Sequence, residues 1–383
     1  MPRPPQLSPA ATSIKGSVYS SVLHRLARYG GEVFPLHVGD TFLEPAEGCR
    51  MEDFTVAGHP GMHRYAPPQG LPALVDAIVE RLRARTGVPL ERENVFVAGG
   101  ATSGLASVVG AVVSPGDEVL ILAPHWPLIE GHVRMAGGLP VDVPFFGVAE
   151  SAATAAAAVE AALTPRTVAL YVNTPSNPTG RVIPRAWLEA LVALARRHDL
   201  WLLFDEVYEE YVYVGEHVPG LSLAPERSFA VHSFSKAYGM AGNRVGYVAG
   251  PAAAIAEALK LSTHTVYAAP TAGQLAALRI LEGAGADWVA RAREAYRSLG
   301  EETADRLGVP RPEGSTFLFL DVAPRLDGRG LPGLLEDAAD RGLLVAPGPS
   351  CGPYPTHVRL CYTSAPPDVV RRGVEVLASL LGR

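Results

Sequence analysis

Apolar segments and amphipathic segments alternate from about residue 70 to residue 250, and this alternation decides the fold class. Apolar residues at helical spacing predict helices over 70–86, 102–113, about 127–136 and 185–198. Short apolar runs predict strands over 94–98, 118–123, 167–172, 200–204, 228–233 and 244–250. Strands that are apolar almost throughout are typical of a parallel sheet covered by helices on both faces. The sequence therefore predicts an α/β fold.

The pattern changes near residue 286. A long polar-rich helix is expected over about 286–307, and mixed strands and helices follow over 316–322, 331–341, 343–347 and 357–362, before a closing helix. Because one hydrophobic core stops growing near ~250–300 residues, a chain of 383 residues is expected to hold two domains. We expect an N-terminal segment over 1–45 that packs on the small domain, a large domain over 46–285 and a small α+β domain over 286–383.

The overall composition excludes several classes of protein. Of the residues, 48% are hydrophobic and 19% are charged, and the net charge of −6 gives no basis for binding nucleic acid or anionic lipid. No apolar run reaches the ~18 residues of a membrane span, and the N-terminus lacks the apolar stretch of a signal peptide. Cys49, Cys351 and Cys361 have no metal-ligand spacing and are odd in number, so we expect neither a metal site nor a disulfide framework. We expect a cytoplasmic protein.

Lys236 is the lysine best placed for chemistry. It ends the segment Ser-Phe-Ser-Lys directly after a predicted buried strand, whereas Lys15 falls in the irregular N-terminal segment and Lys260 on a solvent-facing helix. Ligands of open α/β sheets bind at the carboxyl ends of the strands. A lysine that is desolvated there can act as a nucleophile towards a carbonyl, with Arg244 as a cationic neighbour and Ser233 as a phosphate ligand. The alternative is a loop lysine that pairs with a carboxylate.

Three other strand ends carry polar or glycine-rich segments. Asp205 ends an apolar strand and is either a helix N-cap or a catalytic partner. Residues 99–104 are small and open a helix, which is typical of an anion-binding helix N-terminus and equally of a plain glycine-rich cap; they fit neither the Walker loop nor the dinucleotide fingerprint. The turn over 173–180 contains two prolines and directs Asn177 into the same crevice, unless turn chemistry alone explains it.

Taken in order, these segments resemble the class I and II aminotransferases of fold type I, from about residue 36 to residue 362. The sharpest matches are SFSK at 233–236 with GNRVGY at 242–247, and FDEVY at 204–208. The resemblance implies the fold of type I transferases that depend on pyridoxal 5′-phosphate (PLP), with a mostly parallel sheet between helices in the large domain and a smaller α+β domain. It also implies PLP as cofactor and a homodimer with shared active sites.

The resemblance gives each matching residue a role. Lys236 would hold the cofactor as a Schiff base and then move the α-proton of the substrate. Asp205 would pair with the ring nitrogen, while Tyr208 and Asn177 would donate hydrogen bonds to the ring hydroxyl oxygen. Arg359 would bind the substrate α-carboxylate, a task suited to its planar fork. The remaining matches are the phosphate ligands Gly100, Ala101, Thr102, Ser233 and Arg244, the backbone of Gly39 beside the substrate, and Tyr65, which would reach the phosphate in the neighbouring subunit.

Several alternatives stay open for these residues. Trp126 is favoured over His125 as the aromatic residue that stacks on the cofactor ring, because its π-face is larger. Arg359 could instead form a surface ion pair, and Tyr65 could be a packed aromatic beside a proline-rich turn. The sequence departs from the family's usual residues at Thr174, where asparagine is common, and at 39–41, where Gly-x-Pro is frequent. Both departures lie near the substrate and bear on specificity.

The expected activity is the transfer of an amino group from an L-amino acid to a 2-oxo acid. A PLP-dependent lyase, decarboxylase or oxidase is the main alternative, because one scaffold supports all of these reactions. A non-catalytic ligand sensor fused to a DNA-binding domain is not expected, since the 45 residues before the fold contain no helix-turn-helix with a basic recognition helix.

Overall fold

A seven-stranded sheet forms the centre of the computed structural model, which describes residues 4–14, 16 and 20–383; Lys15 lies outside the described residues. The strand order is β2-β8-β7-β6-β5-β3-β4. The five strands from β7 to β4 run parallel, β8 is antiparallel to β7, and β2 is antiparallel to β8. The strands are β2 (Val95–Ala98), β3 (Glu118–Ala123), β4 (Leu139–Pro144), β5 (Thr167–Asn173), β6 (Trp201–Asp205), β7 (Ser228–Ser233) and β8 (Gly246–Ala249). The predicted α/β fold is confirmed.

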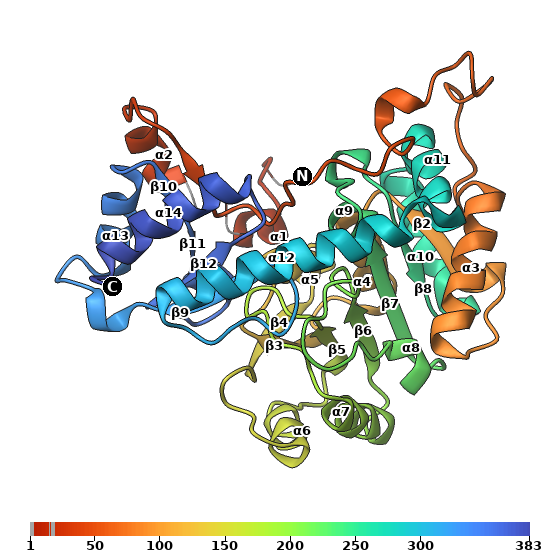
Figure 1. Cartoon of the computed structure of the whole chain (residues 1–383). Coiled ribbons are helices and arrows are strands. Elements are labelled where there is room, and N and C mark those ends of the chain that lie inside the picture. Colours follow the sequence, from red (N-terminus) through yellow and green to blue (C-terminus); the bar gives the residue numbers. More distant parts are fainter. Residues whose placement is uncertain (1–3, 15, 17–19) are drawn as a thin grey trace.

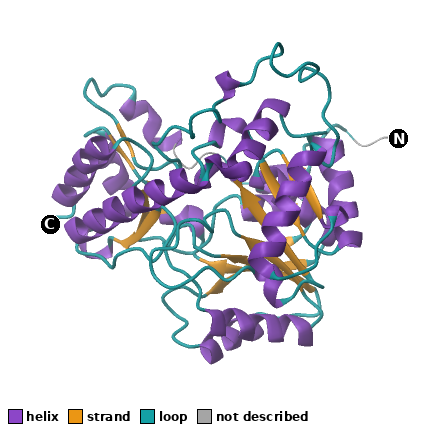
Figure 2. Ribbon diagram, turned by 45° about the vertical axis from the view of Figure 1, so that its right-hand side comes forward, coloured by secondary structure: helices purple, strands orange, loops and turns teal. Residues whose placement is uncertain are grey.

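Helices cover both faces of this sheet, because successive strand residues point to opposite sides. On β3, Val119 and Ile121 enter one core with α4 (Ala101–Val112), whereas Leu120 and Leu122 enter another with α7. The first core also contains α5 (Ile129–Met135) and α10 (Ala252–Thr265). The second face carries α6 (Ala152–Glu160), α7 (Arg185–Arg197), α3 (Pro72–Thr86) and α11 (Thr271–Arg279). Figure 2 shows the strands enclosed between helices.

The C-terminal part of the chain forms a second, smaller core (Figure 1). An antiparallel sheet of order β11-β12-β9 packs against the helices α13 (Gly330–Ala339) and α14 (Pro367–Leu380). The strands are β9 (Phe317–Asp321), β11 (Ala346–Pro347) and β12 (His357–Cys361). The N-terminal segment adds to this unit, since β1 (Phe34–Pro35) pairs in parallel with β10 (Leu343–Leu344).

Helix α12 (Ala286–Leu307) joins the two units and contributes to both cores (Figure 1). Trp288 and Ala292 pack in the large core, and Leu299 and Leu307 pack in the small one. We therefore propose the division into a segment over 1–45, a large domain over 46–285 and a small domain over 286–383, with α12 packing against the cores of both domains.

The predicted elements agree with the structure except at a few places. The strand predicted over 200–204 lies at 201–205, and the strand predicted over 343–347 is two short strands, β10 and β11. The N-terminal segment, predicted to be irregular, contains the short helices α1 (Pro9–Ser13) and α2 (Ser20–Leu26). Helix propensity is weak there, and contacts with α5 and with α13 stabilise these short helices.

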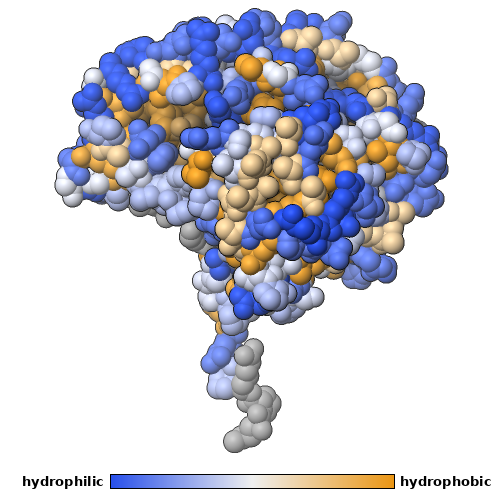
Figure 3. All heavy atoms as spheres, turned by 90° about the horizontal axis from the view of Figure 1, so that it is seen from below, coloured by the Kyte–Doolittle hydropathy of each residue, from blue (hydrophilic) through white to orange (hydrophobic). Residues whose placement is uncertain are grey.

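Polar residues cover most of the face in Figure 3, with small hydrophobic patches between them. Lys260 lies on the exposed side of α10, as predicted, and it pairs with Glu257. Within the described residues, no helix combines the length and the apolar character that crossing a bilayer requires.

Candidate active site

The carboxyl ends of the parallel strands open onto one cavity of about 260 Å³, as expected for ligand sites of open α/β sheets. The residues that line it come from eight segments far apart in the sequence. Predicted site residues in this lining are Gly39, Ala101, Thr102, Trp126, Asn177, Asp205, Tyr208, Ser233, Lys236, Arg244 and Arg359. Leu105, Leu128, Val207 and Ser235 complete it. The structure thus brings nearly all of the predicted set together.

Asp205 is a buried carboxylate at the carboxyl end of β6. The Tyr171 hydroxyl, on the neighbouring strand β5, donates to Asp205 Oδ2 at 2.5 Å, and the backbone N–H of Val207 donates weakly to Oδ1 at 3.4 Å. Burial raises the pKa of Asp205 to about 6, and these two donors oppose the rise. The carboxylate is therefore held in place by the protein and still faces the cavity, where a cationic N–H would find an acceptor.

Lys236 extends into the same cavity from the short helix α9 (Phe234–Ala237), with only 20% of its side chain exposed. Burial lowers the pKa of Lys236, and Arg244 and Arg359 add to this effect, while Asp40 opposes it. The nearest carboxylate oxygen, on Asp40, is 3.9 Å from Nζ. Lys236 and Asp40 thus form a long ion pair, as the alternative of a lysine that pairs with a carboxylate expects, while burial shifts the amine towards its neutral, nucleophilic form.

A set of anion-binding groups also lines the cavity. Helix α4 begins at Ala101, and its cap, Gly100, has φ +85°. A side chain at Gly100 would collide with the guanidinium of Arg244, so only glycine leaves this space open. Arg244 lines the cavity together with the hydroxyl-bearing residues Thr102 and Ser233. A helix N-terminus, an arginine and two hydroxyl groups form a ready site for a phosphate.

Arg359 is buried on β12, between the cavity and the small domain. Its Nη1 donates to Asn177 Oδ1 and its Nη2 to the carbonyl of His37, each at 2.9 Å, and the guanidinium lies 4.6 Å from the ring centre of Phe317. Its Nε has no partner among the described residues. A surface ion pair is therefore excluded, and the guanidinium retains capacity for an anion. Because Asn177 accepts through Oδ1, its amide nitrogen is left to donate to a ligand oxygen.

A second cavity of about 350 Å³ adjoins the first and shares Gly39, Trp126, Leu128 and Arg359 with it. Its wall is mostly apolar, although Glu130, Arg134 and His37 also contribute. No local sequence pattern indicates this space, because its lining residues come from the N-terminal segment, α5 with the loop before it, and the small domain.

Three predicted residues need separate comment. Trp126 lines both cavities, whereas His125 is buried behind it and does not, so the structure favours Trp126 as the stacking residue. Nearby, His232 is buried on β7, where its ring stacks on that of Tyr247. Tyr65 is 87% exposed, its ring lies 4.8 Å from that of Tyr267, and it is absent from the cavity.

Two residues that contact the predicted site residues carry no site signal in the sequence. Tyr171 belongs to a predicted apolar strand, yet its hydroxyl makes the shortest hydrogen bond of Asp205. The pairing of β5 with β6 brings the two residues together, and no local motif encodes it. Asp40, noted only as a departure from the family, is the carboxylate nearest to Lys236 Nζ.

Residues 47–377 match the sequence model of the family described as aminotransferase class I and II. The chain belongs to this family. The aspartate/prephenate aminotransferase of Thermus thermophilus is 36% identical to this aminotransferase, over 94% of the chain and 93% of that protein. The arginine–pyruvate transaminase of Pseudomonas aeruginosa is 37% identical, over 92% of each.

Solved structures show the same relationship. Aspartate aminotransferase from Thermus thermophilus with maleate has a TM-score of 0.88 to this aminotransferase at 33% identity, covering 98% of the chain and 100% of that structure. N-succinyldiaminopimelate aminotransferase from Mycobacterium tuberculosis gives a TM-score of 0.88 at 27% identity and the same coverage. The predictions of the family, the fold and an enzyme that transfers amino groups are confirmed. The family's members depend on PLP.

Proposed function

We propose that PLP binds in the 260 Å³ cavity and that the enzyme moves an amino group from an L-amino acid to a 2-oxo acid. One observation carries the proposal: a buried carboxylate, Asp205, and a desolvated amine, Lys236, line the same cavity as a helix N-terminus flanked by Arg244. These groups match, in turn, the ring nitrogen, the aldehyde carbon and the phosphate of PLP.

Bound there, PLP supplies the electron sink that stabilises negative charge at the substrate Cα. The side chains of this chain do the rest. Asp205 accepts a hydrogen bond from the ring nitrogen and keeps it protonated, and Tyr208 and Asn177 donate to the ring oxygen. Lys236 would move the proton between the substrate Cα and the cofactor, and burial favours this role because it lowers the pKa of the amine and so increases its proton-accepting fraction.

Arg359 is proposed to bind the α-carboxylate of the substrate, with Gly39 leaving room beside it. A side chain at Gly39 would lie 2.7 Å from Phe317 Cζ and so would displace the ring under Arg359. Once the carboxylate is bound, the adjoining 350 Å³ cavity is the space that can take the substrate side chain. Leu128, Trp126, Glu130 and Arg134 line this cavity. We therefore propose that residues of α5 and of the loop before it determine which amino acid side chain binds.

The test is a titration of the PLP-loaded protein with a panel of amino acids, followed by absorption. Each substrate should bleach the visible band of the Lys236-bound cofactor in one turnover, and a 2-oxo acid should restore it. Ammonia or carbon dioxide release with the band retained would instead support the lyase, decarboxylase or oxidase reaction. Absence of a visible band in the loaded wild-type protein would overturn the proposed cofactor.

The pKa of Asp205 predicts how cofactor binding depends on pH. Only the ionised carboxylate accepts from the ring N–H, and its fraction falls as the pH drops through about 6, so PLP affinity should weaken below that pH. Asp205→Asn should bind PLP more weakly at pH 8 and lose the inflection near 6. PLP itself also titrates, so the measurement compares how the PLP dissociation constant depends on pH in the wild type and in Asp205→Asn. Parallel profiles would contradict the assignment.

We also propose a homodimer in which each Tyr65 reaches the phosphate site of the other subunit. The support is its 87% exposure, outside the cavity of its own chain. Tyr65→Phe should weaken PLP binding about 10-fold to 150-fold, the cost of one hydrogen bond to a charged group, while light scattering still gives a dimer. Tyr29→Phe, at a distant tyrosine, is the matched control. A monomeric wild-type protein would contradict the shared site.

A cytoplasmic location is proposed on the state of the cysteines. Cys49, Cys351 and Cys361 are all buried and free, as expected for thiols kept reduced.

A further inference from the structure

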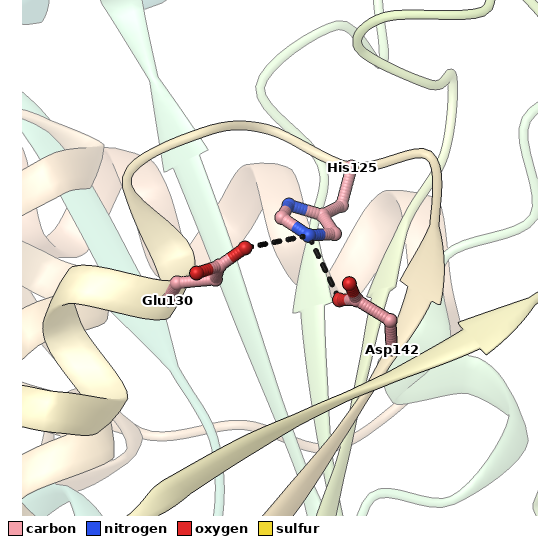
Figure 4. A group of neighbouring side chains, drawn as sticks. All are labelled: His125, Glu130 and Asp142. Carbon is pink, nitrogen blue, oxygen red and sulfur yellow. Dashed lines mark hydrogen bonds and ion pairs between the residues drawn. The ribbon is translucent and has the colours of Figure 1, made fainter. Parts of the chain in front are cut away.

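His125 is a fully buried residue behind the aromatic wall of the active site. It lies in the loop between β3 and α5, directly before Trp126, and is 1% exposed. Figure 4 shows its ring between Glu130, on α5, and Asp142, on β4. No role in the proposed chemistry uses His125, and a buried histidine with two acidic neighbours needs a physical explanation.

The hydrogen bonds of the ring fix its protonation. Nδ1 lies 3.0 Å from the carbonyl oxygen of Trp126, and a carbonyl only accepts, so Nδ1 carries a hydrogen. Nε2 lies 3.0 Å from Asp142 Oδ1 and 3.5 Å from Glu130 Oε1, and an ionised carboxylate also only accepts. Both nitrogens therefore donate, and the ring is a cation. Burial lowers the pKa of His125, but the bonds to Asp142 and Glu130 outweigh it and raise the pKa to about 9.

Opposite charges surround the ring when it is protonated. Asp142 and Glu130 lie against Nε2, and Arg134, on the next turn of α5, lies 3.7 Å from Glu130. His125, Glu130 and Asp142 also have the residue types of a metal centre, with ligand atoms within 4.8 Å of one another. A divalent cation on Nε2 would displace the proton that now bonds to Asp142, and both ring nitrogens already have acceptors, so we interpret the group as an ion cluster.

This cluster connects three elements to the residue that lines the cavity. Nδ1–H donates to the backbone carbonyl of Trp126, and Nε2–H donates to Asp142 on β4. The backbone N–H of His125 donates to the carbonyl of Cys351, in the small domain, at 3.0 Å. Among the described residues, the Cys351 thiol and the Tyr354 phenol are also packed there; burial raises the pKa of each, and Asp142 adds to the effect on Tyr354. Both are neutral at physiological pH.

We propose that His125 is a positioning residue: its imidazolium, anchored by Asp142 and Glu130, fixes the backbone of Trp126 and so sets the orientation of the indole over the cofactor ring. The inference rests on the proposed function, because it requires PLP in the cavity beside Trp126. A hydrogen bond to the carbonyl of the stacking residue limits the rotation of the whole loop over 124–128, whereas packing alone would leave the indole several orientations.

The test uses two amides that each replace one nitrogen of the ring. His125→Asn keeps a donor near Nδ1 and can still hold the carbonyl of Trp126, whereas His125→Gln keeps a donor near Nε2 and loses that bond. The readouts are the visible circular dichroism of bound PLP, which reports the chiral environment of its ring, and the PLP dissociation constant. His125→Gln should weaken PLP binding about fivefold and reduce the dichroism per bound cofactor, and His125→Asn should do so less.

A double-mutant cycle with Trp126→Ala, which removes the stacking ring, separates positioning from general stability. If His125 acts through the indole, His125→Gln should change the PLP dissociation constant less than about twofold in the Trp126→Ala protein, and the two effects should not add. Additive effects, or equal losses in the Asn and Gln variants, would overturn the inference. Thermal melting of each apoprotein controls for folding.

Asp142→Asn keeps the test decisive if the His125 variants do not fold. It retains the imidazole and weakens its anchor, so it should reduce the dichroism in the wild-type background and leave it unchanged beside Trp126→Ala. An equal reduction in both backgrounds would overturn the inference. A wild-type protein without any visible cofactor band would overturn the proposed function and this inference together, whereas a normal band with no response to the variants overturns the inference alone.

Discussion

Replacing Lys236 with alanine is expected to abolish the visible band of the bound cofactor and to reduce kcat on the order of 10⁴-fold. The expected loss is this large because one side chain is proposed to do two tasks, holding the cofactor covalently and moving the Cα proton. PLP should still bind through its phosphate and ring nitrogen, since Asp205 and Arg244 remain. The measurements are the absorption spectrum, the PLP dissociation constant and single-turnover rates.

Two further variants sharpen this prediction. Lys260→Ala is the matched control, because Lys260 lies on the surface of α10 and pairs only with Glu257 among the described residues, so its activity should equal that of the wild type. In Lys236→Ala, added methylamine should restore part of the proton-transfer rate, since a small amine can enter the space left by the side chain. A visible band that persists in Lys236→Ala would contradict the assignment of the covalent site.

The site residues at the strand ends could be predicted from the sequence, because an apolar run marks each strand and ligands of parallel sheets bind at the carboxyl ends. Near-continuous apolar strands indicate a parallel sheet, and a parallel sheet places its ligand at the carboxyl ends, so Asp205 and Lys236 could be assigned from their positions after strands. Contacts between strands distant in sequence carry no such signal. Tyr171 reaches Asp205 only because β5 lies beside β6, and Arg359 reaches Asn177 only because the small domain folds back over the cavity.

A buried network of charges behind Asp205 was equally invisible in the sequence. Glu206 is fully buried and lies within 3.5 Å of His217 and His232, while Glu209 pairs with His232 and Arg85. Burial raises the pKa of Glu209, but His232 and Arg85 outweigh it, so the pKa is well below the usual value. Acidic and basic side chains in the segments 81–85, 206–210 and 217–232 look in isolation like solvent-exposed groups. Together they support the end of β6 from which Asp205 projects.

Replacing Arg359 with glutamine is expected to lower kcat/KM for amino acids about 30-fold to 5000-fold, the range found when one partner of a buried, hydrogen-bonded charge pair is removed. The cofactor band should be retained, because Arg359 lies away from the groups proposed for the phosphate. Arg359→Lys should recover only part of the loss, since an ammonium lacks the planar fork that matches a carboxylate. Single-turnover rates across amino acid concentrations measure the effect.

The control for this prediction changes the substrate as well as the protein. Primary amines without a carboxylate should react slowly with wild type and Arg359→Gln alike, because the proposed contact is absent in both cases. Arg311→Gln, which removes a surface ion pair with Asp305 in the small domain, should leave kcat/KM unchanged. If Arg359→Gln slowed amines and amino acids equally, its main role would be to hold Asn177 and Phe317 in place, and carboxylate binding would have to be assigned elsewhere.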